Sequence, residues 1–327
     1  MKVRSDAHPA LHDLEPSVGA FLAELLRGLS QRPKSIAAKF FYDETGCQLF
    51  DEICSLDEYY LTRTEMRILR EKAAVICALF GPECRLVEFG SGSNAKTRIL
   101  LDHLHAPAAY VPVDIASEQL LQCSARLARV YPELCITPVC ADFTTAAFTL
   151  PETPCPVRRT VAFFPGSTIG NLEPAEAENF FRKISLLCGA DGGLLIGVDL
   201  KKDRLTLERA YNDARGVTAR FNLNLLTRVN RELNGSFDLT SFSHHAFYNS
   251  ERHRIEMHLA SKKRQKVSVA GRSIEFRSGE TIHTENSYKY TLASFSALAR
   301  GSGWTPLAAW TDAGANFSVH ALVFDGV

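Results

Sequence analysis

The chain has 327 residues, room for one large or two ordinary domains, and its 46% hydrophobic and 23% charged residues are typical of a globular protein. Lysine plus arginine and aspartate plus glutamate number 37 each, and the resulting net charge of zero argues against nucleic acid as the main partner. Nine cysteines without a C-x-x-C pattern, no apolar run of membrane-spanning length and no apolar leader at the N-terminus predict a cytoplasmic protein with reduced thiols and no membrane partner.

The first eighty residues contain two expected helices with an aromatic segment between them. Residues 16–32 place apolar side chains at helical spacing, which predicts an amphipathic helix. Residues 36–60 are rich in phenylalanine and tyrosine, and residues 64–80 predict a second helix that leads into the first core strand. The apolar face of the first helix comprises Val18, Phe21, Leu22, Leu25, Leu26 and Leu29.

From residue 85 to residue 199 the chain alternates between apolar strands and helices. Strands are expected at residues 85–89, 109–113, 135–139, 160–164 and 193–199. Helices are expected between them at residues 95–104, 116–130 and 174–188. This alternation predicts a parallel sheet with helices on its faces.

The periodicity changes after Asp199. Residues 203–233 predict two helices broken near Gly216, and residues from about 237 to 290 predict antiparallel strands. The last expected elements are a helix and the two strands of a hairpin, at residues 292–301, 304–310 and 317–324.

A glycine-rich turn follows the first core strand and carries the strongest functional signal. Gly90 and Gly92 are followed by Ala95 in a G-x-G-x-x-A pattern, which lets backbone amides approach a nucleotide-like ligand. Asp114 ends the next strand, where an acid can accept hydrogen bonds from both hydroxyls of a ribose. Together they predict a site for an adenosine cofactor.

The turn leaves three interpretations open. Ala95 replaces the third glycine of the dinucleotide fingerprint, and the P-loop pattern lacks its penultimate glycine. Glu88, just before the turn, would repel a pyrophosphate and attract a sulfonium or amino group, which favours S-adenosylmethionine. A dinucleotide site and a purely structural glycine turn are the alternatives.

The expected fold class is α/β, because a parallel sheet closed by an antiparallel C-terminal hairpin is the layout of class I, Rossmann-like methyltransferases. The change of periodicity predicts a second, α+β domain that binds the substrate. The core domain is expected to comprise residues 62–199 and 286–327, and the substrate-binding domain residues 1–61 and 200–285.

Two further segments follow core strands and carry polar side chains. Asp142 and Phe143 come after the third expected strand, where an acid and an aromatic ring could bind adenine; a simple loop is the alternative. Residues 163–171 follow the fourth strand and end in Asn171. Ligands of open α/β sheets bind at that edge, although the same side chains could cap a helix beginning at Pro174.

The ten histidines show no spacing typical of a metal site. His253 and His258 are five residues apart, which in a strand places them on opposite faces. We therefore expect structural histidines and no bound metal.

Eight motifs resemble those of one family: Phe41–Asp43, Tyr59–Arg63, Val87–Gly92, Gly166–Asn171, Arg209–Tyr211, Gly216–Asn222, Arg254–Met257 and Thr284–Ser287. On these motifs the chain resembles the histidine Nα-methyltransferases of ergothioneine biosynthesis from about residue 30 to its end. The likeness includes the inserted second domain, which makes it more specific than the glycine turn. A small departure is Leu61, which stands where many relatives have proline.

The resemblance implies roles for particular residues. The family's S-adenosylmethionine contacts match Gly90, Lys96, Asp114, Asp142 and Phe143. Its substrate contacts match Asn171 and Tyr211 for the carboxylate with Tyr59 nearby, and Glu285 and Ser287 for the imidazole beside Met257. Tyr42 matches a tyrosine near the reacting amine and is the expected catalytic residue.

The implied activity is S-adenosylmethionine-dependent trimethylation of the α-amine of L-histidine to hercynine, the first step of ergothioneine biosynthesis. We expect a monomer that uses S-adenosylmethionine as its co-substrate. Two alternatives stay open: an enzyme for another aromatic amino acid such as tryptophan, and a catalytically silent module that only binds S-adenosylmethionine.

Overall fold

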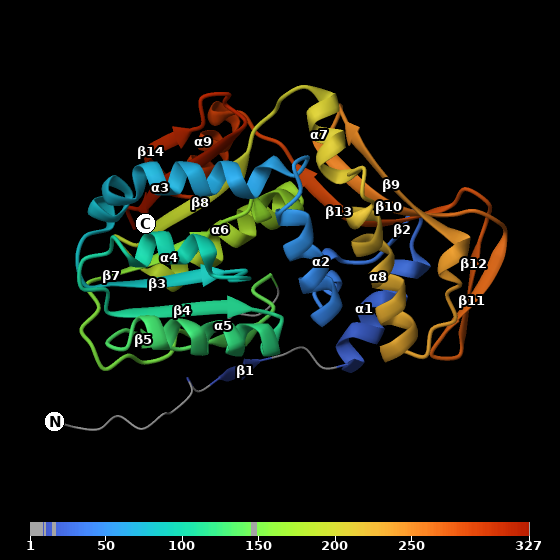
Figure 1. Cartoon of the computed structure of the whole chain (residues 1–327), viewed down its shortest axis with the longest axis horizontal. Helices are drawn as coiled ribbons and strands as arrows, with labels where there is room; N and C mark the ends of the chain where they lie inside the picture. Colours follow the sequence, from blue (N-terminus) through green and yellow to red (C-terminus); the bar gives the residue numbers. More distant parts are fainter. Residues whose placement is uncertain (1–8, 10, 15–17, 145–148, 327) are drawn as a thin grey trace. The chain divides into compact units, whose positions relative to one another are not determined.

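The computed structural model describes residues 9, 11–14, 18–144 and 149–326. The chain divides into two compact units, whose elements are labelled in Figure 1. The first unit comprises the chain up to residue 15 together with residues 63–200 and 290–327, and the second comprises residues 16–62 and 201–289. Each unit is therefore assembled from separate stretches of the sequence.

The first unit contains a nine-stranded sheet with the strand order β1-β6-β4-β3-β7-β8-β15-β14, and with β5 paired to β4. Its strands are β1 (His12–Leu14), β3 (Cys84–Phe89), β4 (Ala109–Asp114), β5 (Cys135–Ile136), β6 (Val139–Ala141), β7 (Arg159–Phe164), β8 (Gly193–Asp199), β14 (Trp304–Thr311) and β15 (Phe317–Phe324). Neighbouring strands from β1 to β8 are parallel, whereas β15 pairs antiparallel with both β8 and β14. The predicted class I, Rossmann-like α/β fold with its C-terminal hairpin is confirmed.

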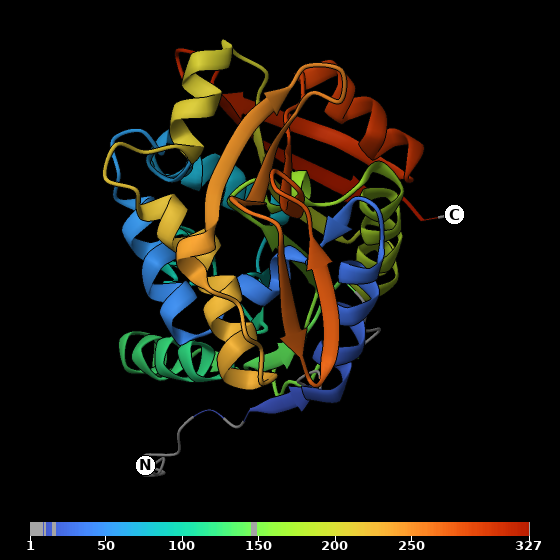
Figure 2. The ribbon, with the colours of Figure 1, turned by 90° about the vertical axis from the view of Figure 1, so that its right-hand side faces the viewer.

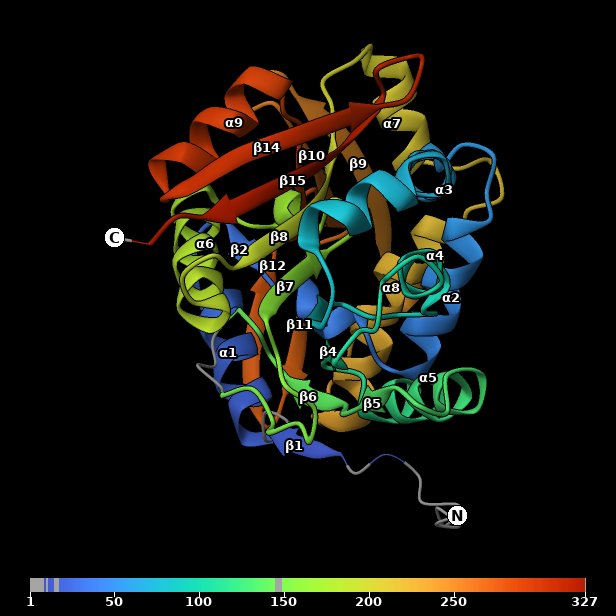
Figure 3. The same cartoon turned by 90° about the vertical axis from the view of Figure 1, so that its left-hand side faces the viewer.

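Helices lie on both faces of this sheet. They are α3 (Tyr60–Phe80), α4 (Ala95–Leu101), α5 (Ser117–Val130), α6 (Pro174–Cys188) and α9 (Leu292–Gly301). Figure 3 shows α6 and α9 on one face and α3, α4 and α5 on the other. Under α6 the rings of Phe164 and Phe180 stack with centroids 4.3 Å apart, and the Trp304 indole donates to the Phe181 carbonyl at 3.1 Å.

The second unit has mixed α and β structure. A four-stranded sheet runs in the order β2-β13-β10-β9, and two further strands pair as a hairpin. These strands are β2 (Lys34–Ser35), β9 (Phe242–Asn249), β10 (Arg254–Ser261), β13 (Thr281–Tyr288), β11 (Gln265–Val269) and β12 (Arg272–Phe276). Figure 2 shows strands of this unit in orange. The helices of the second unit are α1 (Val18–Ser30), α2 (Glu44–Cys54), α7 (Arg204–Tyr211) and α8 (Val217–Glu232).

Most expected elements occur, and the differences have local causes. The strand expected at 135–139 is split into β5 and β6, because Pro138 has no amide hydrogen to give to a neighbouring strand. The expected break near Gly216 is present, with a φ of 67° at that glycine. The helix expected at 16–32 is α1; residues 16 and 17 and the Val18 side chain lie outside the described residues.

Apart from shifts of one residue at Thr62 and Leu200, the unit boundaries differ from the expected domain boundaries at two places. β1 pairs in parallel with β6 and so belongs to the first unit, although residues 1–61 were assigned to the second domain. Residues 286–289 belong to the second unit, because β13 continues to Tyr288, which pairs with Arg254. None of the helices that the structure describes combines the length and the apolar character that a bilayer-spanning segment needs.

Candidate functional site

The glycine turn connects β3 to α4 in the first unit. Gly90 and Gly92 have φ values of 74° and 46°, in the left-handed region that residues with a Cβ rarely adopt. A Cβ at either position would meet no other atom within 4 Å, so the turn borders open space. The backbone can therefore approach a ligand closely here.

Asp114 ends β4, the neighbour of β3, and its carboxylate binds the same turn. Its Oδ2 accepts a hydrogen bond from the Gly92 amide at 3.3 Å, and its Oδ1 accepts one from the Ala116 amide at 3.1 Å. Burial raises the pKa of the Asp114 carboxyl, and these backbone amides oppose the rise. Because a carboxylate offers about four lone-pair positions, Asp114 can still accept from ligand hydroxyls.

Glu88 has a structural role in the described turn. Its buried carboxyl accepts hydrogen bonds from the hydroxyls of Thr97 on α4 and Tyr110 on β4 and so ties β3 to its neighbours. Burial raises the pKa of Glu88 to about 8, against the hydrogen bonds from Thr97 and Tyr110. The expected attraction between its carboxylate and a sulfonium stays a prediction.

Lys96, in the first turn of α4, is held by an acid that the sequence did not reveal as a partner. Its Nζ lies 2.6 Å from Oε2 of the buried Glu65, on α3. Glu65 also accepts a hydrogen bond from the Gly166 amide at 2.9 Å. Gly197 of β8 makes room for this carboxylate, because a Cβ there would lie 2.0 Å from Glu65 Oε1. The cofactor contact expected of Lys96 stays a prediction.

The other candidates of the first unit follow the carboxyl ends of β6 and β7. Asp142 Oδ1 accepts from the Thr144 amide at 2.9 Å. The Phe143 ring packs edge-on against Phe89 with centroids 5.6 Å apart. Asn171 ends the short 3-10 helix η2 (Thr168–Asn171) after β7. Since Asp114 and the glycine turn also follow parallel strands, these residues share one edge of the sheet, the edge where such folds bind ligands.

In the second unit, β10 and β13 present polar residues on one face of their sheet. Met257 pairs with Glu285, and Ile255 pairs with Ser287. Because side chains alternate along a strand, Met257, Glu285 and Ser287 lie on the same face. The sheet itself thus fixes the spacing of the acid and the hydroxyl.

Ser287 is held by two donors on this face. Tyr211, at the end of α7, donates from Oη to Ser287 Oγ at 2.7 Å. The buried Lys289 donates from Nζ to Ser287 Oγ at 2.7 Å and to Tyr211 Oη at 3.2 Å. His244 lies 2.9 Å from the Tyr211 carbonyl through Nε2 and so holds the end of α7 on β9. Both acceptor positions of Ser287 Oγ are filled, and its own hydrogen remains for a ligand.

Aromatic residues from the N-terminal part of the unit gather around the same groups. The ring of Tyr59 packs edge-on against that of Tyr211 at 6.2 Å and against that of Phe50 at 6.3 Å. Tyr42 in turn packs edge-on against Phe50 at 5.8 Å. Burial raises the pKa of Tyr59 well above its usual range, and nearby Tyr211 and Glu285 raise it further, so its hydroxyl stays protonated.

Glu285 is the titratable group of this face. Burial raises the pKa of its carboxyl from 4.5 to about 7, and the positive charge of Lys289 opposes the rise. At neutral pH the carboxyl therefore exists in both protonation states, so a ligand that donates a hydrogen bond would favour its ionised form.

The structure brings together Tyr42, Tyr59, Tyr211, Met257, Glu285 and Ser287 within the second unit, whereas Asn171 belongs to the first. Two residues were missed. Lys289 stands two positions after Ser287, directly after the end of β13, and this alternation was a usable signal that it shares the face. Glu65 gave no local signal, because its partners Lys96 and Gly166 are distant in sequence.

The residues of the first unit fit an adenosyl cofactor. The glycine turn is open where a Cβ would lie, and the Asp114 carboxylate is an acceptor suited to ribose hydroxyls. Residues 21–324 match a family described as histidine-specific, S-adenosylmethionine-dependent methyltransferases.

Curated relatives of this chain are also methyltransferases, named for histidine or for tryptophan. The chain is 41% identical over 311 residues to a histidine N-alpha-methyltransferase of Mycolicibacterium smegmatis, which covers 92% of this chain and 95% of that protein. Identity to the Mycobacterium tuberculosis protein of the same name is 39% over 308 residues, covering 92% and 94%. The chain is 25% identical over 337 residues to an L-tryptophan methyltransferase of Psilocybe serbica, and the match covers 92% of this chain and 92% of that protein. The chain thus belongs to the family of histidine-specific, S-adenosylmethionine-dependent methyltransferases.

Proposed function

We propose that this protein transfers methyl groups from S-adenosylmethionine to the α-amino nitrogen of L-histidine, three times, to give hercynine, the first intermediate of ergothioneine biosynthesis. The observation that carries the substrate assignment is the pair formed by Glu285 and Ser287. The Glu285 carboxylate can accept a hydrogen bond, and the Ser287 hydroxyl has only its hydrogen left to donate.

Neutral imidazole matches this pair. It has one ring nitrogen that carries a hydrogen and one that carries a lone pair. Glu285 accepts from the first nitrogen, and the Ser287 hydroxyl donates to the second. Indole has an N–H and no second ring nitrogen, so tryptophan leaves the Ser287 hydrogen without its acceptor. A site that leaves buried polar groups unpaired rejects the wrong ligand strongly.

The chemistry needs positioning more than charge. When bound, S-adenosylmethionine would supply an electrophilic methyl group on a sulfonium. The lone pair of the neutral amine would form the new N–C bond as the C–S bond breaks, and a proton would leave the nitrogen for solvent after each of the first two transfers. Because the transition state disperses charge, much of the rate comes from holding nitrogen and carbon in line at about 3–3.5 Å. Glu285 and Ser287 anchor the ring, Tyr42 is the proposed contact of the amine, and Gly90, Lys96, Asp114, Asp142 and Phe143 are the proposed cofactor contacts.

The substrate carboxylate is assigned to Asn171 and Tyr211, with Tyr59 nearby. Tyr211 gives its hydroxyl hydrogen to Ser287 in this structure, so a contact with a carboxylate requires the hydroxyl to turn. The Tyr59 ring packs edge-on against that of Tyr211, so its hydroxyl is the neighbouring donor of the proposal, and Tyr211 also supports Ser287.

The proposal is tested by incubating the purified protein with S-adenosylmethionine and L-histidine and following the products by mass spectrometry. We expect histidine to gain three methyl groups, and histamine, which lacks the carboxylate, to react very slowly. Faster methylation of tryptophan would support the alternative substrate. Binding of S-adenosylmethionine without methylation of either amino acid would support the silent module. Monomeric state, cytoplasmic location and the lack of a nucleic-acid partner stay predictions.

Lys289→Met is expected to lower kcat/KM for histidine by about 10- to 150-fold, because the charge-assisted hydrogen bond that orients Ser287 is worth about 1.5–3 kcal/mol. Combined with Ser287→Ala the losses should not add, since both changes break the same contact. Lys262→Met, at an exposed lysine of the same unit, is the matched control. Steady-state kinetics of the single and double variants measure the coupling, and fully additive losses would contradict the role of Lys289.

A further inference from the structure

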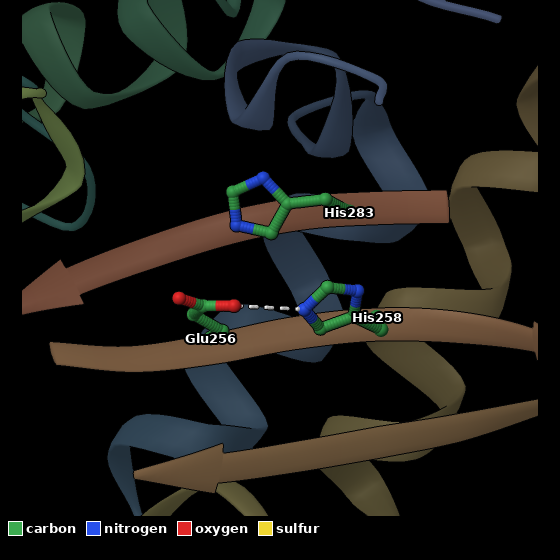
Figure 4. A group of neighbouring side chains, drawn as sticks. All are labelled: Glu256, His258 and His283. Atoms are coloured by element: carbon green, nitrogen blue, oxygen red, sulfur yellow. Dashed lines mark hydrogen bonds and ion pairs between the residues drawn. The ribbon is translucent and has the colours of Figure 1, made fainter. Parts of the chain in front are cut away.

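The opposite face of the same sheet carries a second cluster of ligating groups. Glu256 and His258 are two residues apart on β10, and His283 on β13 is the cross-strand partner of His258. Met257 lies between the first two, so this cluster and the Met257–Glu285 pair occupy opposite faces. Figure 4 shows the carboxylate and the two rings on the same side of their strands.

The three side chains are close enough to share one ion. One ligand atom from each lies within 4.8 Å of the others. Glu256 Oε2 is 3.2 Å from His258 Nε2. In a tetrahedral zinc site, metal–ligand bonds of about 2.0–2.1 Å place ligand atoms about 3.4 Å apart. The Glu256–His258 separation of 3.2 Å is close to this value, and the His283 ligand atom lies within 4.8 Å of both.

Each prospective ligand is also oriented by an outer partner. Arg254 Nε and Asn249 Nδ2 donate to Glu256 Oε1 at 2.8 and 2.9 Å, which leaves Oε2 toward the imidazoles. His283 Nε2 lies 3.1 Å from the Glu285 carbonyl, a contact that fixes the orientation of the ring.

His258 has a comparable partner, since its Nδ1 lies 3.2 Å from the Thr281 hydroxyl. Outer partners of this kind are the usual support of metal-bound histidines and carboxylates.

We propose that Glu256, His258 and His283 form a binding site for a borderline divalent cation of the zinc class, with at least one coordination position left for water. Two imidazoles and one carboxylate are a donor set that such cations favour. The site is separate from the substrate face, and its role is to hold β10 and β13 together at the bulge that follows Met257.

The test uses the full chain, stripped with a chelator and titrated with ZnSO4 in a calorimeter at pH 7.5. We expect one Zn2+ ion per chain and a rise of a few degrees in Tm, because a ligand that binds only the folded state stabilises it. His258→Ala and His283→Ala should each weaken Zn2+ binding by about 100-fold or more. His253→Asn, at an exposed histidine of the same unit, should bind Zn2+ like the wild type.

Loss of binding is separated from loss of folding by comparing the circular dichroism and Tm of each chelated variant with those of the chelated wild type. Co2+ titrated into the wild type gives an independent readout, with the visible absorption of a four- or five-coordinate ion expected. No Zn2+ uptake by the wild type below about 100 µM, or unchanged uptake by both alanine variants, would overturn the proposal. The outcome is independent of methylation activity.

Discussion

Replacing Glu285 by glutamine is expected to lower kcat/KM for L-histidine by about 10- to 150-fold, because a charge-assisted hydrogen bond to the imidazole is worth about 1.5–3 kcal/mol. Glutamine keeps the size of the side chain, so the loss reports on charge rather than on a new cavity. Selectivity against tryptophan should fall as well, because the penalty for leaving the acid unpaired is removed. Affinity for S-adenosylmethionine should stay the same, since the glycine turn and Asp114 belong to the first unit.

The pH dependence gives a second signature of Glu285. Its carboxylate can accept from the ring only when ionised, and with a pKa of about 7 the ionised fraction falls about tenfold between pH 8 and pH 6. When the pH is lowered from 8 to 6, kcat/KM of the wild type should therefore fall by a factor about ten times larger than that of Glu285→Gln.

The contribution of Glu285 to the free energy of unfolding falls as the pH rises, whereas its contribution to histidine binding grows. The pKa of Glu285 in the folded chain, about 7, lies above its ordinary 4.5, so the folded state holds this proton longer. The stability that Glu285 contributes is complete below pH 4.5 and is lost as the pH rises toward 7. Glu275→Gln, at an exposed acid of β12 paired with Lys266, is the control. A Glu285→Gln variant with wild-type histidine activity and selectivity would remove Glu285 from recognition.

The second large effect concerns the cofactor. Asp114→Ala should weaken binding of S-adenosylmethionine by about 1–3 kcal/mol, or roughly 5- to 150-fold in Kd, because hydrogen bonds to the ribose are lost. Asp114→Asn retains one carboxamide oxygen for the Gly92 or Ala116 amide and should lose less. Calorimetric titration of each purified variant with S-adenosylmethionine measures the difference.

Asp102 provides the matched control for Asp114. It is an exposed acid at the end of α4 that accepts a hydrogen bond from the Tyr131 hydroxyl at 2.6 Å. Asp102→Ala should leave cofactor affinity unchanged. Equal affinities for the wild type and Asp114→Ala would place the ribose elsewhere on the sheet edge.

Elements that carry their own periodic signal could be predicted from the sequence. α6 and β8 have the expected bounds, because their apolar spacing and their flanking proline and glycines are local features. β1 was not expected, since three exposed residues pair with β6 and carry no periodicity of their own. A contact that joins distant segments determines such an element, and no local pattern reports it.

The same distinction explains the site residues. Glu88 was assigned an electrostatic role from its position before the turn, whereas its environment is set by Thr97 and Tyr110. The expectation of no bound metal depends on the spacing of the ten histidines along the sequence, such as that from His253 to His258. The cluster on the far face of the sheet depends on His283, which reaches His258 through the pairing of β13 with β10. Strand pairing brings together residues whose spacing in the sequence does not indicate that they are close.

The pairing of β2 with β13 has a consequence for synthesis on the ribosome. Lys34 leaves the ribosome early, yet its hydrogen-bond partner Glu280 lies 246 residues further along the chain. The sheet of the second unit therefore cannot close until most of the polypeptide has been translated, and the first unit waits still longer for β14 and β15. A premature stop before β13 should therefore leave neither unit folded.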